Sequence, residues 1–191
     1  MGLPKTGAQH FSYADYCQWP EDERFELIDG VAHAMGPAPL RRHQVFAGEI
    51  FRQIANALKG KPCQPFIAPF DVRLPKADRA DDKIDTVVQP DISVVCDPKK
   101  LDERGCNGAP DWVIEVISPA TASHDHILKR QVYERAGVQE YWIVHPVDRM
   151  VTVYRLIDGA YQRPDVYELT GTLASLAVPS AAVDWSELAA E

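Results

Sequence analysis

The sequence lacks several features that would indicate a membrane protein, a zinc-binding protein or a nucleotide-binding protein. It has no run of about twenty apolar residues, as a transmembrane helix requires, and no signal-peptide pattern. A glycine-rich phosphate loop, an internal repeat and a low-complexity segment are also absent. The four cysteines have no CxxC pair and no regular spacing, so free thiols of a reducing compartment are predicted for Cys17, Cys63, Cys96 and Cys106. These absences predict a soluble cytoplasmic protein.

An excess of positive charge is absent as well. The 191 residues include 28 acidic and 20 basic side chains, a formal net charge of −8. This balance argues against a protein that grips nucleic acid over its whole surface. A local basic groove is compatible with it, because basic residues precede and follow the central segment 89–117: Arg41, Arg42, Lys59, Lys61, Lys129 and Arg130.

The length and the 46% hydrophobic composition predict a single domain over residues 1–191 with a sizeable core. We expect the core over about residues 40–146. An N-terminal arm and hairpin are expected over about residues 12–36, and a C-terminal hairpin and tail over about residues 147–191.

Two short apolar runs in the centre of the chain each carry a carboxylate. Residues 92–95 (ISVV) and 112–117 (WVIEVI) are rich in β-branched residues and too short for helices, so both are predicted to be buried strands. Asp91 stands at the mouth of the first run, and Glu115 interrupts the second. A lone buried carboxylate is strongly unfavourable. If the strands are neighbours, we therefore expect the two acids to meet near the strand ends around a hard cation, Mg²⁺ or Mn²⁺.

A helix is predicted to follow the second run. Residues 122–136 have helical spacing, and Gly137 ends the pattern. One face of this helix is apolar except for Asp125 and Lys129, and it comprises Asp125, Leu128, Lys129, Val132, Tyr133 and Ala136. This face would carry the Lys129 ammonium toward the acid pair. The alternative is an ordinary exposed ion pair between Asp125 and Lys129.

Two further residues are candidates for the same site. The alternation from Arg24 to Met35 around Asp29-Gly30 predicts a β-hairpin with a type I′ turn. Glu26 lies on the first strand of this hairpin. A helix is predicted from Leu40 to Leu58. His43 near its start is either structural or a group that contacts substrate phosphate or orders a water on the metal.

The other segments complete the expected fold. Residues 64–74 are predicted to form one strand and residues 75–85 a mobile, solvated loop. The order of strand, helix and strand that ends at residues 140–145 implies a parallel crossover. A second hairpin is expected around Asp158-Gly159, and a short helix near residues 185–190. The exposed strands of this last part are the expected surface of a homodimer.

Several motifs in combination resemble those of the Uma-two family of bacterial restriction-endonuclease-like proteins, within the PD-(D/E)XK nuclease superfamily. The resemblance covers roughly residues 20–160 and involves ELIDG (26–30), His43-Gln44, QPDISVV (89–95), APDWVIEVISP (109–119), Asp125, Lys129, Tyr133 and EYWIV (140–144). It implies an α/β fold with a restriction-endonuclease-like core, in which helices flank a mixed central sheet between an N-terminal β-hairpin and a C-terminal hairpin extension. It also implies that Asp91 is the first acid of the superfamily motif and Glu115 the second. Glu26, in the ELIDG motif, is by this resemblance a third acid of the site; the alternative is a hairpin surface residue.

Two positions depart from the family pattern. The superfamily expects a lysine two residues after the second acid, where this chain has Ile117. Migration of that lysine onto the following helix is a variation that the superfamily tolerates, and it would give the role to Lys129. His145 stands where the family usually shows an aspartate, and we expect this position to be structural.

The leading hypothesis is a metal-dependent endonuclease that hydrolyses DNA phosphodiester bonds. Its metal, Mg²⁺ or Mn²⁺, would be bound by Asp91 and Glu115, and Lys129 would polarise the attacked phosphate or the water. The supporting or substrate-binding residues would be Glu26, His43 and Asp125.

Two alternatives stay open. The first is a catalytically inactive member of the fold that binds nucleic acid or a protein partner, for which Ile117, His145 and the acidic net charge speak. The second is a transition-metal site at His124-Asp125-His126. It requires an extended segment, because residues i and i+2 of a helix face different ways.

Overall fold

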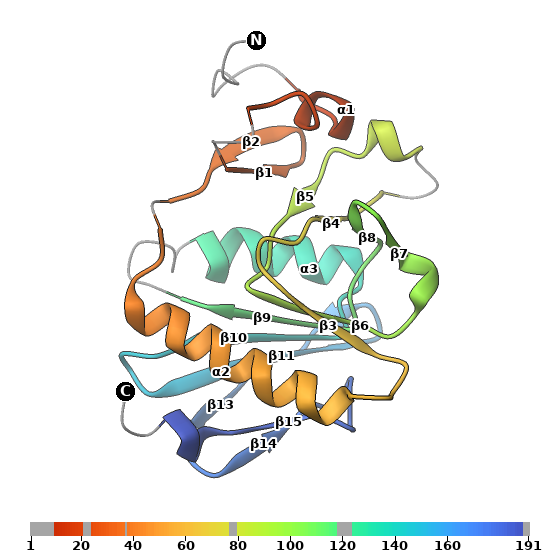
Figure 1. The fold of residues 1–191 in the computed structure, drawn as a ribbon. Coiled ribbons are helices and arrows are strands. Elements are labelled where there is room, and N and C mark those ends of the chain that lie inside the picture. The colour runs from red at the N-terminus through yellow and green to blue at the C-terminus, as the bar shows by residue number, and fades with distance from the viewer. Residues whose placement is uncertain (1–9, 21–23, 37, 77–79, 118–123, 189–191) are drawn as a thin grey trace.

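The computed structural model describes residues 10–20, 24–36, 38–76, 80–117 and 124–188, with the backbone alone for 124–126. Within these residues, two mixed sheets are flanked by two longer helical segments (Figure 1). Helix α2 is Arg41–Leu58, and α3 (Arg130–Ala136) continues a π-helical segment, His124–Lys129. The predicted mixed α/β architecture is confirmed.

The larger sheet has the strand order β12-β11-β10-β9-β6-β3, with β13 beside β11. Strand β9 is parallel to β10 and antiparallel to β6, so the expected parallel crossover through α3 is present. The two acid-bearing strands are therefore neighbours. The strands of this sheet are β3 (Gln64–Ile67), β6 (Ile92–Val95), β9 (Trp112–Val116), β10 (Glu140–His145), β11 (Met150–Ile157), β12 (Ala160–Tyr161) and β13 (Asp165–Glu168).

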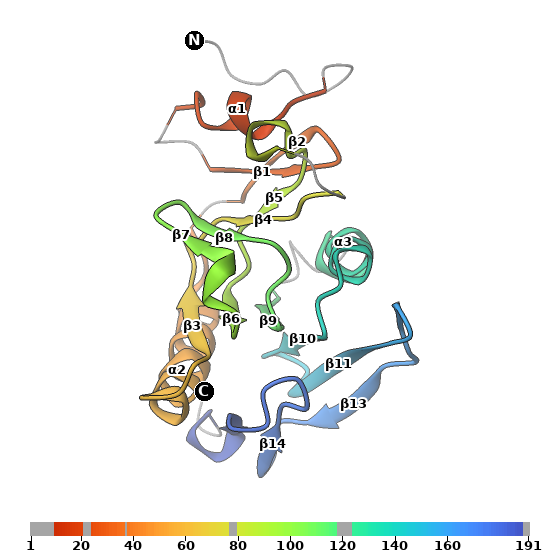
Figure 2. The ribbon, with the colours of Figure 1, turned by 90° about the vertical axis from the view of Figure 1, so that its right-hand side faces the viewer.

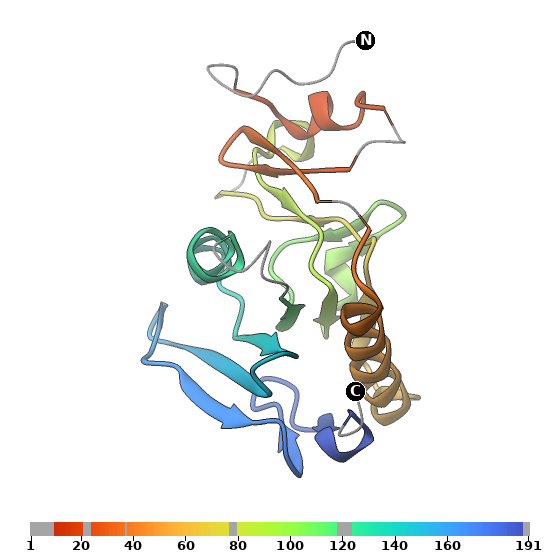
Figure 3. The same cartoon turned by 90° about the vertical axis from the view of Figure 1, so that its left-hand side faces the viewer.

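The smaller sheet has the order β2-β1-β5-β4-β8-β7 and includes the N-terminal hairpin. Its strands are β1 (Phe25–Ile28), β2 (Val31–Ala34), β4 (Val72–Arg73), β5 (Val87–Val88), β7 (Leu101–Asp102) and β8 (Gly105–Asn107). Figures 2 and 3 show helix α1 (Tyr13–Tyr16) and this hairpin at one end of the molecule. The ribbon of β14 (Thr172–Ala174) and β15 (Ala182–Asp184) lies at the other end, close to the final 3₁₀ turn Trp185–Leu188.

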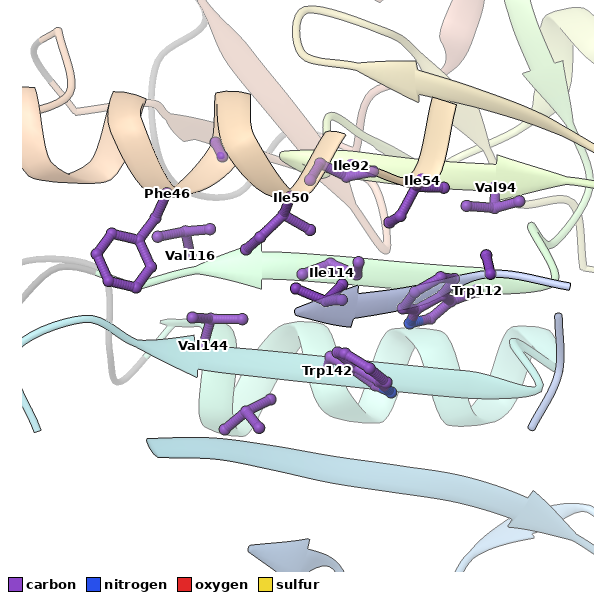
Figure 4. Packing of buried hydrophobic residues seen from close by; sticks show 14 of the residues in the cluster. Phe46, Ile50, Ile54, Ile92, Val94, Trp112, Ile114, Val116, Trp142 and Val144 are labelled. Atoms are coloured by element: carbon purple, nitrogen blue, oxygen red, sulfur yellow. The ribbon is translucent and has the colours of Figure 1, made fainter. Parts of the chain in front are cut away.

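The two faces of the larger sheet bury different residues, because successive side chains of a strand point to opposite faces. Figure 4 shows Phe46, Ile50 and Ile54 of α2 lying over one face. The even-numbered residues of β6 and β9 line that face, among them Ile92 and Ile114. The odd-numbered residues turn to the other face, where α3 and the smaller sheet pack on them; they include Val95 and Val113. Glu115 is odd-numbered, and its alternation therefore directs it toward α3.

Both predicted hairpins are confirmed. Asp29 and Gly30 have φ values of 50° and 78°, and Asp158 and Gly159 have 52° and 79°. A type I′ turn requires a positive φ at both central residues, which explains these residue types. The helical faces are confirmed as well: Val132 and Tyr133 of α3 are buried, and Leu128 and Ala136 pack against the same cluster.

The predicted strand over residues 64–74 is wrong. Strand β3 ends at Ile67, the Ala68–Pro69 peptide bond is cis, and β4 resumes in the smaller sheet. The expectation of a solvated loop over residues 75–85 is also wrong at its end, where Ile84 and Asp85 are buried. Asp85 forms an ion pair with Lys76 there.

The prediction of four free thiols is wrong for one pair. Cys63 and Cys96 form a disulfide, whereas Cys17 and Cys106 are free. The reason is the register of β3 and β6, in which Gln64 lies opposite Val95. The next residue outward on each strand is then a cysteine, so the two face each other across the sheet. Among the described helices, none is long and apolar enough to cross a membrane.

Candidate active site

The carboxylates of Asp91 and Glu115 meet where β6 begins and β9 ends. The register pairs Ile92 with Ile114, which brings the flanking acids opposite each other. Each acid accepts a hydrogen bond from the backbone of the other strand: Val116 N donates to Asp91 Oδ2 over 2.8 Å, and Asp91 N donates to Glu115 Oε2 over 3.3 Å. The two carboxylates are thus fixed side by side by the antiparallel ladder.

The Lys129 ammonium reaches Glu115 of this pair from the residue just before α3. Its Nζ lies 2.9 Å from Glu115 Oε1, and the residue is 5% exposed. The alternative of an exposed ion pair is therefore wrong for Lys129. Ile117, at the position where the superfamily expects lysine, packs against the apolar cluster under α3. The cation beside the second acid comes from the helical segment that follows β9.

Glu26 lies on the other side of the same ammonium. Its Oε1 is 3.0 Å from Lys129 Nζ and accepts a hydrogen bond of 2.8 Å from Gln89 N. Glu26 is 3% exposed, so the interpretation of a hairpin surface residue is wrong. One buried ammonium therefore lies between two buried carboxylates that come from different sheets.

His43 contacts the more open acid of the pair. From the first turn of α2, its Nε2 lies 3.0 Å from Asp91 Oδ2. The Asp91 side chain is 20% exposed, and its Oδ1 has no hydrogen-bond partner in the part of the chain that the structure describes. The Asp91 side chain is thus more exposed than those of Glu26 and Glu115, each 4% exposed. Arg41 and Arg42, one turn before Phe46, are exposed at the same end of α2.

A second layer of hydrogen bonds joins Gln89 to the N-terminal part. Its side-chain Nε2 donates to Asp71 Oδ1 over 2.8 Å, and its Oε1 accepts from Arg24 over 2.6 Å. Tyr16 OH also donates to Asp71 Oδ1. Burial and the charge of Asp71 raise the pKa of the Tyr16 phenol, which keeps it protonated as a donor. The residues before Asp91 are thereby tied to the hairpin that carries Glu26.

A family model described as Uma2, "Putative restriction endonuclease", matches residues 13–188. The chain belongs to the Uma2 family. An uncharacterized protein of Synechocystis sp. is 28% identical over 184 residues, which cover 92% of this chain and 93% of that protein. The crystal structure of a "putative nuclease" from Anabaena variabilis has the same fold, with a TM-score of 0.73 at 22% identity over 93% of this chain and 97% of that one.

The contacts described above do not include the remaining residues singled out in the sequence of this Uma2 protein. His145, one of the departures from the family pattern, is buried at the end of β10, and its Nε2 lies 3.3 Å from Thr152 Oγ1. This contact agrees with the structural role expected for it. The side chains of Asp125, His124 and His126 lie outside the described residues, and with them the alternative transition-metal site.

The donor set fits a hard cation with a small number of protein ligands. Asp91, Glu115 and Glu26 contribute three carboxylates near one ammonium, so negative charge predominates. No group of three or more His, Cys, Asp or Glu side chains suited to a metal ion occurs in the described ranges. Mg²⁺ commonly takes one or two carboxylates and completes its shell with water and substrate phosphate. The Asp91 and Glu115 pair suits that mode of binding.

Sequence reasoning did not assign a role in the site to Tyr133. Its hydroxyl donates to Glu115 Oε1 over 2.9 Å. The signal was available in the spacing, because Tyr133 follows Lys129 by four residues on the same helical face.

Proposed function

We propose that this Uma2 protein is a metal-dependent endonuclease that hydrolyses DNA phosphodiester bonds. The observation that carries the proposal is the buried Lys129 ammonium 2.9 Å from Glu115, beside the neighbouring acid Asp91. Two adjacent carboxylates at a strand end, one of them paired with a buried lysine, supply the groups that phosphodiester hydrolysis needs. The family description and the fold of the Anabaena protein agree with this chemistry.

Each residue has a defined part in the proposal. Asp91 and Glu115 would hold Mg²⁺ or Mn²⁺, which when bound activates water and neutralises negative charge on the phosphate. Lys129 keeps a positive charge beside Glu115 and close to the scissile group. His43, hydrogen-bonded to Asp91, orients that carboxylate and lies at a helix start that favours phosphate. Arg41 and Arg42 bind the flanking backbone of the DNA, which confines the basic contacts to one region of an acidic protein.

The decisive experiment is a cleavage assay on plasmid, linear duplex and single-stranded DNA with Mg²⁺ and with Mn²⁺. We expect cleavage by the wild-type protein and none by Asp91→Ala, while Glu103→Ala, which changes an exposed acid in the turn between β7 and β8, keeps full activity. Calorimetric titration with Mn²⁺ should show binding that Asp91→Ala and Glu115→Ala weaken. If all three proteins bind Mn²⁺ equally and none cleaves DNA, the inactive alternative is correct.

The proposal extends to the assembly and the compartment. Residues 1–191 are taken as one domain that acts on DNA in the cytoplasm and forms a homodimer through β13. All four residues of this strand are exposed, with Val166 at 58%, and β13 pairs with β11. Light scattering should then show a dimer that Val166→Lys converts to a monomer, because a buried ammonium at the interface is unfavourable.

A further inference from the structure

Tyr133 is a buried tyrosine that the proposed chemistry does not use. It lies one helical turn after Lys129, and its side chain is fully buried. The ring packs edge-on against Tyr141 with centroids 4.9 Å apart, so its direction is fixed by the core. Its hydroxyl is thereby held on Glu115 Oε1 at 2.9 Å.

The contacts of Glu115 divide its two oxygens between different neighbours. Oε1 accepts from Tyr133 OH of α3 and from Lys129 Nζ just before α3, each at 2.9 Å. Oε2 faces the backbone N–H of Asp91 at 3.3 Å. The terminal torsion of a glutamate is broad, so its own rotamer preference does not fix the plane of the carboxylate. Two donors on one oxygen fix that plane and leave the other oxygen facing Asp91.

We propose that Tyr133 is a positioning residue for the second acid: it reserves Oε1 of Glu115 for α3 and turns Oε2 toward Asp91 and the metal. This inference rests on the proposed function. A ligating carboxylate is generally oriented by hydrogen bonds from outside the metal's own ligands, and loss of such a partner typically weakens metal binding by about 10–100-fold.

A second tyrosine in the same apolar cluster provides a matched control. Tyr161 is 9% exposed, and its hydroxyl is buried without a hydrogen-bond partner among the described residues. Tyr161→Phe also removes one phenolic hydroxyl from this cluster, but it leaves the hydrogen bonds of Glu115 unchanged. Burial of a tyrosine in this cluster therefore does not by itself require a carboxylate partner for the hydroxyl.

The test is calorimetric titration of the full chain with Mn²⁺. For Tyr133→Phe we expect affinity to fall by about tenfold or more, as for loss of a hydrogen bond to a metal ligand. Tyr161→Phe should bind as the wild type does. Replacement of Tyr133 by 4-aminophenylalanine keeps the ring and a donor N–H, so it should restore wild-type affinity. That rescue separates orientation of Glu115 from a packing role, and it also decides the matter if Tyr133→Phe does not fold.

The Asp91→Ala variant distinguishes failure of the positioning role from failure of the proposed metal site. If it abolishes Mn²⁺ binding while Tyr133→Phe binds normally, the positioning role is wrong and the proposed function stands. Weak binding by the 4-aminophenylalanine variant would overturn the positioning role in the same way. If Asp91→Ala binds Mn²⁺ as the wild type does, the metal site is wrong, and the role of Tyr133 falls with it.

Discussion

Replacing Lys129 by methionine removes the positive charge that joins Glu26 to Glu115. Methionine keeps the apolar stem, so the change acts mainly on the ammonium. Both carboxylates are 3% exposed and lie within 3.0 Å of Nζ. Removal of one partner from a buried ion pair typically lowers the free energy of unfolding by about 3–5 kcal/mol.

The remaining donors set the expected value near the lower end of this range. Glu115 keeps the Tyr133 hydroxyl, and Glu26 keeps the Gln89 N–H. We therefore expect a loss of about 3 kcal/mol, which lowers the melting temperature by roughly 6–12 °C for a chain of this size. Below that temperature Mn²⁺ binding should persist, while DNA cleavage falls by about 100-fold or more, as for loss of an electrostatic group at a reacting centre.

Lys76→Met is the control for these measurements. Lys76 Nζ also joins two carboxylates, Asp29 at 2.7 Å and Asp85 at 3.1 Å, but its side chain is 37% exposed. Because Asp85 is buried, loss of the Lys76 ammonium should lower the free energy of unfolding, but by less than Lys129→Met does because solvent reaches Lys76, and cleavage should be unchanged. Thermal and urea unfolding of both variants decide the point. If Lys129→Met melts with the wild type, or cleaves DNA at the wild-type rate, the assignment of Lys129 is refuted.

Three further predictions concern the fold. Val132→Asp should lower the free energy of unfolding in urea by more than about 3 kcal/mol, because Val132 is 2% exposed. Arg130→Asp, on the neighbouring face of the helix, should lower it by less than about 1 kcal/mol, and equal losses would contradict the helix phase. Glu140→Gln should cost about 2–4 kcal/mol in the same assay, because one Glu140 oxygen accepts three hydrogen bonds from residues 175–177; a change below about 0.5 kcal/mol would contradict this. The hydrogen bond from Arg73 lowers the pKa of Asp102. The stabilisation that Asp102→Asn removes should therefore be present above about pH 4 and vanish as the pH falls through the lowered pKa. If urea titrations at pH 2 still show a difference in stability between this variant and the wild type, the prediction is wrong.

The elements of the site were predictable because their signals are local. The apolar runs of β6 and β9, the face of α3 and the two type I′ turns follow from spacing and residue type over fewer than about twenty residues. The convergence of Asp91 and Glu115 needed the further assumption that their strands are neighbours, which the register confirms.

What failed depends on contacts between distant segments. Glu26 was a candidate for the site, but the pattern of β1 does not indicate that it contacts the Lys129 ammonium, because alternation gives the face of a strand and not its partner in another sheet. The Cys63–Cys96 disulfide was missed for a similar reason, since it follows from a register that the spacing of the cysteines does not encode. Glu115 is bound by Tyr133 only because both side chains point into one buried layer.

Because the Lys129 ammonium lies between Glu26 and Glu115, the site is complete only when the N-terminal hairpin has folded onto the rest of the chain. Gln89 N and Glu26 are 63 residues apart in sequence, whereas Lys129 and Glu115 are 14 apart. Long-range contacts form at a higher entropic cost and govern the folding rate of a domain. The acid pair and the lysine can therefore come together in a chain that still lacks its hairpin, but the lysine is held on both sides only when the hairpin docks. A fragment that begins after residue 36 would retain β6, β9 and α3 and yet leave Lys129 with one of its two carboxylates.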